Sequence, residues 1–204
     1  MHRRPLLSLL HRYAGATSVD AELARVRRIR SLVTANEDCF LRTARPGHIT
    51  ASAWVLSADR RRCLLLHHRK LGRWLQPGGH ADGDPDVLAV ALREAGEESG
   101  LPDLAPLPPP GTTDRVASEA DGGVLPLDVD VHLIPERRGA TGSVLEDAHE
   151  HHDVRFLLAA QRERPLVVSD ESHDVRWFTP QQVREQTDEA SVLRLLDKAL
   201  PAMA

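Results

Sequence analysis

The sequence predicts a mixed α/β sandwich, in which a sheet packs against helices. A helical pattern near residues 86–99 lies between segments that alternate apolar and polar residues, as strands do. The links between most of these segments are short, as in hairpins, which argues against a doubly wound parallel sheet. With 204 residues and no internal repeat, the chain is long enough to bury one compact core.

Residues 1–45 are predicted to form an N-terminal helical appendage. Apolar residues recur at helical spacing from Arg4 to about Asp38, and arginines occupy the opposite face. We expect Ser18 to be a helix N-cap, and the arginines to form a solvated face rather than a ligand site. If the chain forms a homodimer, these helices are where we expect the contact.

The remainder of the chain, residues 46–204, is predicted to hold the sheet. A hairpin is expected from HITASAWVLS (48–57) and RRCLLLHHRK (61–70), joined by a turn at Ala58-Asp59. A helix is expected from about Asp86 to Ser99, with Asp84 as its N-cap and Pro85 as its first residue.

Beyond this helix, the segment LAPLPPPGTT (104–113) is interpreted as a stiff connector, because it is rich in proline. Strands are then expected in LPLDVDVHLIP (125–135), HHDVRFLLAA (151–160) and HDVRWF (173–178). A helix from Asp188 to Leu200 closes the predicted fold.

Composition and charge exclude several classes of function. The chain has 26 Lys+Arg and 30 Asp+Glu, a formal net charge of −4, and so lacks the broad positive field that a nucleic acid polymer needs. Its cysteines, Cys39 and Cys63, show no disulfide or zinc spacing. No segment has the roughly 18 consecutive apolar residues of a membrane helix, and no export signal is evident. We therefore expect a cytoplasmic protein with neither a nucleic acid nor a membrane as partner.

Three carboxylates define the candidate site. Glu94, Glu97 and Glu98 are related by steps of three and four residues, so on a helix they project from one side. Because such like charges repel, a bound divalent cation is the natural neutraliser. Gly78 and Gly79 stand where a strand must turn sharply toward the helix, and a glycine lets a backbone carbonyl approach the same cation. Hard oxygen ligands favour Mg²⁺ or Mn²⁺ over zinc, so the pattern predicts phosphate chemistry.

At these residues the chain resembles the Nudix hydrolase family, whose signature is G-x5-E-x7-R-E-U-x-E-E-x-G-U, with U an aliphatic residue. The matching positions are Gly79, Arg93, Glu94, Glu97, Glu98, Gly100 and Leu101, and the preceding WLQPGG (74–79) is also typical of the family. A looser resemblance extends from about His48 to about Gln182. It implies a Nudix-type α/β/α sandwich with a mixed β-sheet, to which the N-terminal helical segment is added.

The resemblance also implies an activity. It is Mg²⁺-dependent cleavage of a phosphoanhydride bond in a nucleoside diphosphate derivative or another organic diphosphate, with Mn²⁺ as a substitute ion. In this reaction a water molecule, deprotonated by a glutamate, attacks phosphorus in line.

Site residues follow from the same resemblance. The metal ligands are the Gly78 carbonyl, Glu94, Glu97 and Glu98, and Arg93 orients a glutamate. Glu171, in the loop before the last strand, is the candidate for a further metal ligand or the general base. Its nearest competitor is Asp170, and the alternative is that Glu171 is an ordinary loop carboxylate. The catalytic set is therefore Arg93, Glu97, Glu98 and Glu171, and the candidates for holding the substrate are Arg69, His80 and Arg155.

Two other functions stay open. Pro85 replaces the first glutamate of the signature, which favours a Nudix-fold domain that binds a nucleotide without cleaving it, unless Asp84 or Asp86 supports Arg93 instead. A related diphosphate isomerase would need an active-site cysteine, a role for which neither cysteine is well placed.

One histidine-rich segment has a separate interpretation. HEHH (149–152) offers zinc ligands, but it has neither cysteines nor an H-x3-H pair. We interpret it as a solvated loop that runs into a strand.

Overall fold

The structure, a computed structural model, describes residues 2–112, 123–139 and 141–204. Its helices are α1 (Arg4–Ala16), α2 (Asp20–Ala35), α3 (Val87–Ser99), α4 (Pro180–Gln186), α5 (Ala190–Ala199) and the short 3₁₀ helix η1 (Leu200–Ala202). Its strands are β1 (Gly47–Leu56), β2 (Cys63–His68), β3 (Arg73–Leu75), β4 (Gly78–His80), β5 (Leu104–Leu107), β6 (Asp128–Ile134), β7 (Arg137–Arg138), β8 (Val144–Glu146), β9 (His149–Ala160) and β10 (Ser172–Phe178).

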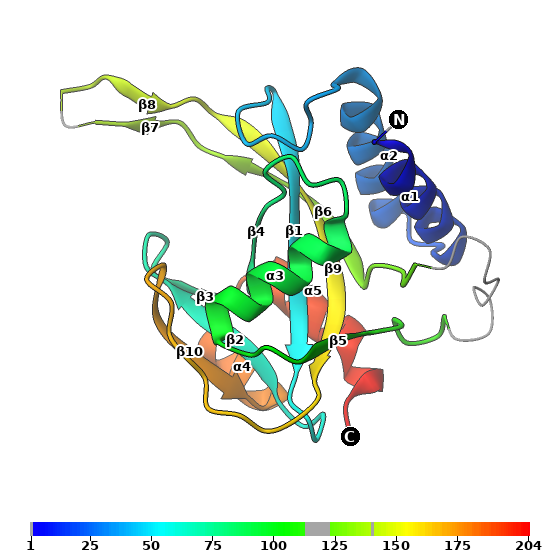
Figure 1. Cartoon of the computed structure of the whole chain (residues 1–204), viewed down its shortest axis with the longest axis vertical. Coiled ribbons are helices and arrows are strands. Elements are labelled where there is room, and N and C mark those ends of the chain that lie inside the picture. The colour runs from blue at the N-terminus through cyan, green and yellow to red at the C-terminus, as the bar shows by residue number, and fades with distance from the viewer. Residues whose placement is uncertain (1, 113–122, 140) are drawn as a thin grey trace.

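A mixed sheet organises the molecule. Its strand order is β10-β2-β1-β9-β5, with β3 paired to β2, β4 to β1 and β6 to β9. β1 and β9 run parallel along the whole of β1, and the other pairs are antiparallel. The β7–β8 ribbon projects away from the body of the molecule (Figure 1). The predicted mixed α/β architecture is confirmed.

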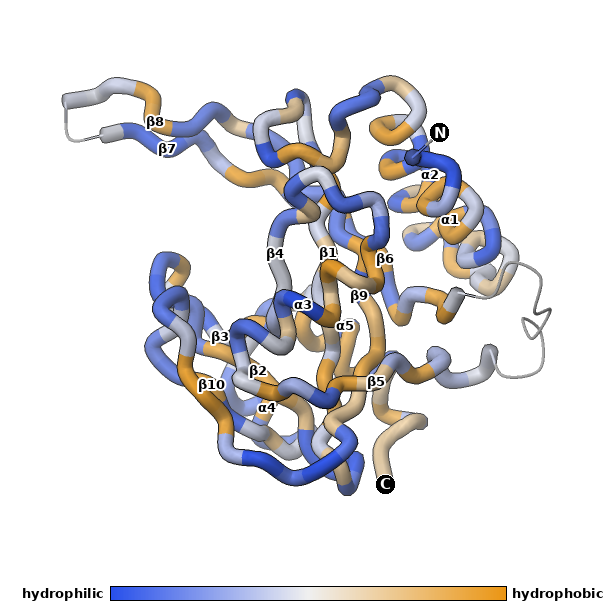
Figure 2. The backbone as a smooth tube through the Cα atoms, in the orientation of Figure 1, coloured by the Kyte–Doolittle hydropathy of each residue, from blue (hydrophilic) through white to orange (hydrophobic). Residues whose placement is uncertain are grey.

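Helices cover both faces of the sheet because β1 is apolar on both sides. Ile49 and Ala51 belong to a buried cluster that includes α1, α2 and α3. Trp54 and Leu56 belong to a second cluster with α4 and α5. Figure 2 shows apolar segments in the central strands and along these helices. None of the described helices combines the length and the apolar character needed to cross a membrane.

The N-terminal segment folds as two helices that pack on the same core as the rest of the chain. Leu10 of α1 and Ile29 of α2 are fully buried in the first cluster, together with Phe156 of β9. The predicted N-cap at Ser18 is wrong, because Val19 occupies the cap position without a side-chain hydrogen bond. The Thr17 hydroxyl accepts a hydrogen bond from the Val19 N–H instead, at 3.2 Å.

Two further expectations about local structure are corrected. Asp86, not Asp84, is the N-cap of α3, and its carboxylate accepts a hydrogen bond from the Ala89 N–H. Pro85 therefore lies before the helix rather than at its first position. The segment interpreted as a connector contains β5, which pairs with the end of β9, so its first residues are part of the sheet. Thr113, the last residue of that segment, lies outside the described residues.

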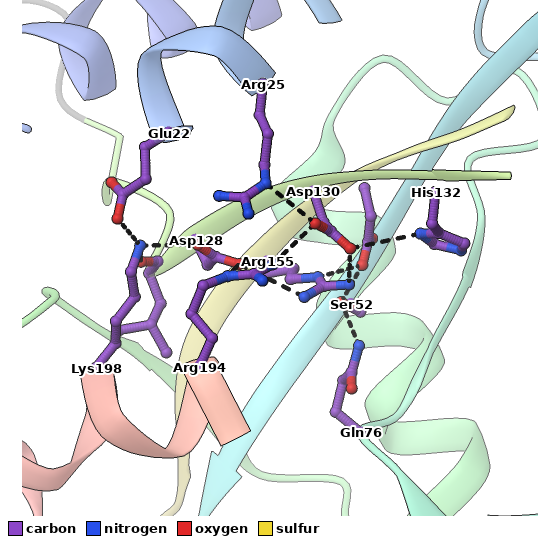
Figure 3. Close-up of polar contacts among 12 residues, drawn as sticks. Glu22, Arg25, Ser52, Gln76, Asp128, Asp130, His132, Arg155, Arg194 and Lys198 are labelled. Atoms are coloured by element: carbon purple, nitrogen blue, oxygen red, sulfur yellow. Dashed lines mark hydrogen bonds and ion pairs between the residues drawn. The ribbon is translucent and has the colours of Figure 1, made fainter. Parts of the chain in front are cut away.

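A buried network of charges ties the layers together (Figure 3). Arg155 of β9 is 2% exposed, and its side chain lies 2.8 Å from Asp153, 2.9 Å from Asp130 and 3.5 Å from Asp128. The surrounding ion pairs bring in α2 and α5 through Arg25 to Asp130, Arg194 to Asp128 and Asp130, and Lys198 to Asp128 and Glu22. The N-terminal helices are thus joined to the sheet by charge as well as by apolar packing.

Removing the central cation of this network should destabilise the fold strongly. Arg155→Met leaves carboxylates buried without their partner, which costs about 3–5 kcal/mol of unfolding free energy. The matched control is Arg62→Met, because Arg62 forms an exposed ion pair with Glu163, and such pairs contribute at most about 1 kcal/mol. Urea unfolding of both variants measures the difference, and equal losses would contradict this role for Arg155.

Candidate active site

One cleft collects the acidic residues of α3. It has a volume of about 460 Å³ and walls from β1, β4, α3, β6 and β9 and from the loop before β10. Its lining includes Gly78, Gly79, His80, Arg93, Glu94, Glu97, Glu98 and Glu171. Two larger hollows, of about 650 and 690 Å³, contain none of the α3 glutamates. We therefore place the candidate chemistry in the smaller cleft.

The helix α3 is anchored from behind, so that its acidic side faces the cleft. Ala91 and Ala95 are fully buried in the first apolar cluster, and Leu88 and Leu92 pack against it. The helix ends at Gly100, whose φ of 73° is the left-handed conformation that glycine adopts without strain. Figure 1 shows α3 lying across β1 and β4. This packing fixes the positions of the glutamates.

Glu98 is the most buried of the three carboxylates, with 8% of the residue exposed. Its Oε2 accepts a hydrogen bond of 2.8 Å from the Gly78 N–H. Burial, together with the neighbouring charges of Glu94, Glu171 and Glu97, raises the pKa of Glu98 to about 7, although the hydrogen bond from Gly78 acts in the opposite direction. The site thus holds Glu98 where its negative charge is disfavoured.

Glu94 lies beside the glycine turn. Burial raises its pKa, with smaller contributions from Glu97 and Glu171, while Arg93 acts against the shift. Oε1 of Glu94 is 2.7 Å from Nη1 of Arg93. A Cβ atom placed on Gly79 would lie 2.5 Å from the Glu94 carboxylate, so only glycine leaves room for this side chain.

Arg93 connects two of the glutamates. Besides Glu94, its Nη1 contacts Glu97 at 3.5 Å, and its Nη2 donates to the His80 carbonyl at 3.3 Å. Glu97 has 63% of its side chain exposed and is the most open of the three. Asp84 and Asp86 contribute no contact to Arg93 among the described residues; the Asp84 carboxylate accepts from the Asp86 N–H instead. The support for Arg93 therefore comes from α3 and β4.

Glu171 reaches the same cleft from the loop before β10. Its backbone carbonyl accepts a hydrogen bond from the Arg69 N–H at 2.9 Å, which fastens the loop to the end of β2. Its charge contributes to the raised pKa values of Glu94 and Glu98. The neighbouring Asp170 is not among the residues that line the cleft.

These carboxylates fit a hard divalent cation. Four glutamates line one cleft, and two of them have raised pKa values because they are buried together. Mg²⁺ and Mn²⁺ prefer such oxygen ligands, and a cation would remove the repulsion that disfavours their charged forms.

Of the three residues expected to hold the substrate, the structure places only one in the cleft. His80 lines the cleft. Arg69 does not line it, and its guanidinium donates to the Ser172 carbonyl at 3.1 Å. Arg155 is buried and enclosed by three aspartates of β6 and β9, so a substrate does not reach it. We therefore leave Arg69 and Arg155 out of the proposed site.

The predicted set of site residues lacks several residues that the cleft contains. Arg42, Lys70 and Asp82 line the cleft, and Arg42 forms an ion pair with Asp82 through both carboxylate oxygens. Asp153 lies deeper and accepts hydrogen bonds from the hydroxyl groups of β1. No local pattern marks Arg42 or Asp82, since only tertiary folding brings them to the cleft.

The histidine-rich segment at 149–152 is also corrected. It is not a solvated loop, because β9 begins at His149, and His149 and His152 are 2% and 3% exposed. Burial, together with the neighbouring His80 and His149, lowers the pKa of His48, on the paired strand, to about 4. Its imidazole is therefore neutral near pH 7.

Comparison with known proteins agrees with this geometry. The family model described as NUDIX domain matches residues 46–198. The chain belongs to the Nudix hydrolase family. A search of curated proteins found no match.

Solved structures show the same Nudix fold. An Ap4A hydrolase from C. elegans has 18% sequence identity and a TM-score of 0.52, with 76% of this chain and 96% of that chain covered. A hydrolase of the NUDIX family from Clostridium perfringens has 21% identity and a TM-score of 0.53, with 76% and 97% covered. At these identities the likeness shows the fold alone.

The two adjacent glycines should respond differently to alanine. Gly79→Ala pushes only the mobile end of Glu94, so we expect weaker Mg²⁺ binding with little change in melting temperature. Gly78→Ala sets a Cβ atom 2.7 Å from the Ser52 Cα and 2.9 Å from the Ala51 carbonyl, so we expect loss of stability.

Calorimetric Mg²⁺ titration and thermal melting of both variants test this contrast. Gly15→Ala is the control, because a Cβ atom there meets nothing within 4 Å. Unchanged Mg²⁺ affinity in Gly79→Ala would show that the Glu94 carboxylate is not held in place for a metal.

Proposed function

We propose that this chain hydrolyses a phosphoanhydride bond of a nucleoside diphosphate derivative or another organic diphosphate, with Mg²⁺ as its metal. One observation carries the proposal: Glu94, Glu97 and Glu98 line a single cleft with Glu171 and the glycine turn of β4. The cationic groups Arg42, Lys70 and Arg93 line the same cleft. A site that binds a cation between carboxylates and also offers positive groups is suited to a diphosphate.

The glutamates and the Gly78 carbonyl would hold the metal. When bound, Mg²⁺ would draw charge from the phosphoryl oxygens and make phosphorus more electrophilic. Arg93 positions Glu94 and Glu97 by its contacts at 2.7 and 3.5 Å. The hydrogen bond from Gly78 fixes the orientation of the Glu98 carboxylate.

The remaining acidic group suits proton transfer. Glu171 comes from a different element than the α3 glutamates, so it can face a water molecule from the other side of the cleft. We assign it the role of general base or of a further metal ligand. As the water oxygen bonds to phosphorus, the bond to the bridging oxygen breaks and the leaving phosphate takes up the electron pair. His80, Lys70 and Arg42 are placed to contact the anionic oxygens of the substrate.

Neither alternative function has equal support. An isomerase would need a reactive thiol, but Cys39 and Cys63 are buried, and burial raises the pKa of their thiols to about 11 and about 12. The departure at Pro85 favours a binding module, but Pro85 lines the hollow beside α1 and not the acidic cleft. The substitution therefore leaves the carboxylates of the cleft complete.

Amide substitutions test the proposed hydrolysis. Glu97→Gln and Glu98→Gln each remove an anionic ligand without removing volume, so turnover should fall by orders of magnitude while the fold persists. Phosphate or monophosphate release from a library of organic diphosphates, with Mg²⁺ present, measures the effect. The control is Glu163→Gln, since Glu163 is exposed and outside the cleft.

The outcome also separates hydrolysis from binding alone. If no diphosphate is cleaved by the unmodified chain, but nucleotides bind in the cleft, the binding module is the correct function. Near-normal turnover in both glutamine variants at saturating Mg²⁺ would remove these glutamates from the catalytic site.

A further inference from the structure

Five histidines from four strands gather beside the acidic cleft. They are His48 of β1, His80 of β4, His132 of β6, and His149 and His151 of β9. The ring centroid of His48 lies 4.8 Å from that of His151, 4.9 Å from that of His149 and 5.1 Å from that of His80. Nothing in the proposed hydrolysis requires so many imidazoles in one place.

The sheet register produces this cluster. His48 lies opposite His151 in the parallel pair of β1 and β9, and His132 lies opposite His151 in the pair of β6 and β9. His80 pairs with Thr50, two residues along β1 from His48, and residues two apart point to the same face of a sheet. The convergence is therefore built into the central strands and not into a surface loop.

His48 has no protein partner for its polar atoms. It is 1% exposed, and neither of its ring nitrogens has a hydrogen-bond partner among the described residues. Buried polar groups are nearly always satisfied, so an imidazole left unpaired at this depth indicates a missing ligand. The rings that pack against it belong to three other histidines.

We propose that His48, His80 and His151 bind a transition-metal ion, Zn²⁺, at a site distinct from the carboxylates of α3. One ligand atom from each of the three lies within 4.8 Å of the others. Neutral imidazole is a ligand for zinc, whereas Mg²⁺ prefers oxygen, so the two sites select different ions. Three histidines leave a fourth position open on a tetrahedral ion.

His149 lies beside the three proposed ligands and is placed to contact the same ion. Its Nδ1 is 2.8 Å from the Asp147 carbonyl, an acceptor, which fixes the proton on Nδ1 and leaves the lone pair on Nε2. That Nε2 is 3.3 Å from Nε2 of His151, about the separation of two nitrogens that share a tetrahedral zinc ion at roughly 2.0–2.1 Å. A backbone acceptor on the far ring nitrogen is the usual partner of a metal-binding histidine.

The position of this site gives it access to the substrate. His80 and His151 line the same cleft as Glu94 and Glu98. An ion held by the histidines would therefore lie beside a molecule bound at the carboxylates. The zinc site itself does not depend on the proposed hydrolysis.

Zinc retention in the presence of excess Mg²⁺ tests the proposal. The full chain, carrying no histidine tag, is stripped of metal, incubated with Zn²⁺ in millimolar Mg²⁺, passed through a desalting column and analysed for zinc. We expect about one equivalent of zinc, and His48→Gln and His151→Gln should each lower the affinity at least tenfold. Co²⁺ in place of Zn²⁺ should give the visible absorption of a tetrahedral site with nitrogen ligands.

Two matched variants make the result specific. His173→Gln removes an exposed histidine outside the cluster, and Glu98→Gln removes a carboxylate of α3; both should retain zinc. If the buried His48→Gln variant fails to fold, the half-buried His80→Gln gives the same test. Absence of stoichiometric zinc, or loss of zinc in Glu98→Gln with retention in the histidine variants, would overturn the proposal.

Discussion

The site depends on one electrostatic constraint: three carboxylates are held on one side of α3 against the backbone of β4. Left to itself, this arrangement opposes ionisation, because Glu98 is buried and lies near Glu94 and Glu171. A carboxyl group whose pKa is raised from 4.5 to about 7 stabilises the folded state below pH 4.5, and that contribution is lost as the pH rises through 7. Apolar packing of α3 must offset this cost near neutral pH. A divalent cation would relieve it directly.

The central pair of parallel strands links the site to the rest of the molecule. The register of β1 and β9 sets Thr50 opposite Asp153 and His48 opposite His151, and of these Thr50, Asp153 and His151 line the cleft. Further along β9, the same strand carries Arg155 into the buried charge network with β6 and α5. The N-terminal helices join this network and the apolar core but contribute no residue to the lining of the cleft. They hold the sheet in place.

Local patterns in the sequence were sufficient to predict site residues that lie on a single helix or strand. The spacing of Glu94, Glu97 and Glu98 predicted a shared helix face, and the mixed sandwich followed from the order of helical and strand patterns. Features set by contacts distant in sequence could not be predicted. Arg155 looked available to a substrate, because alternation along β9 does not reveal that Asp128 of β6 lies opposite it and that Asp130 also pairs with it. The histidine cluster likewise requires the register of four strands. The strand β5 was not predicted because it lies in a proline-rich segment and its pairing partner, β9, lies far along the chain.

The most direct test of the electrostatic account is the number of protons released when Mg²⁺ binds. Because Glu98 has a pKa of about 7, it is mostly protonated at pH 6 and must lose that proton to become a ligand. Calorimetric titrations in two buffers of different ionisation enthalpy should show release of about one proton at pH 6 and almost none at pH 8.5. Glu98→Gln should abolish the release at pH 6. Equal release by this variant and the unmodified chain would contradict the account.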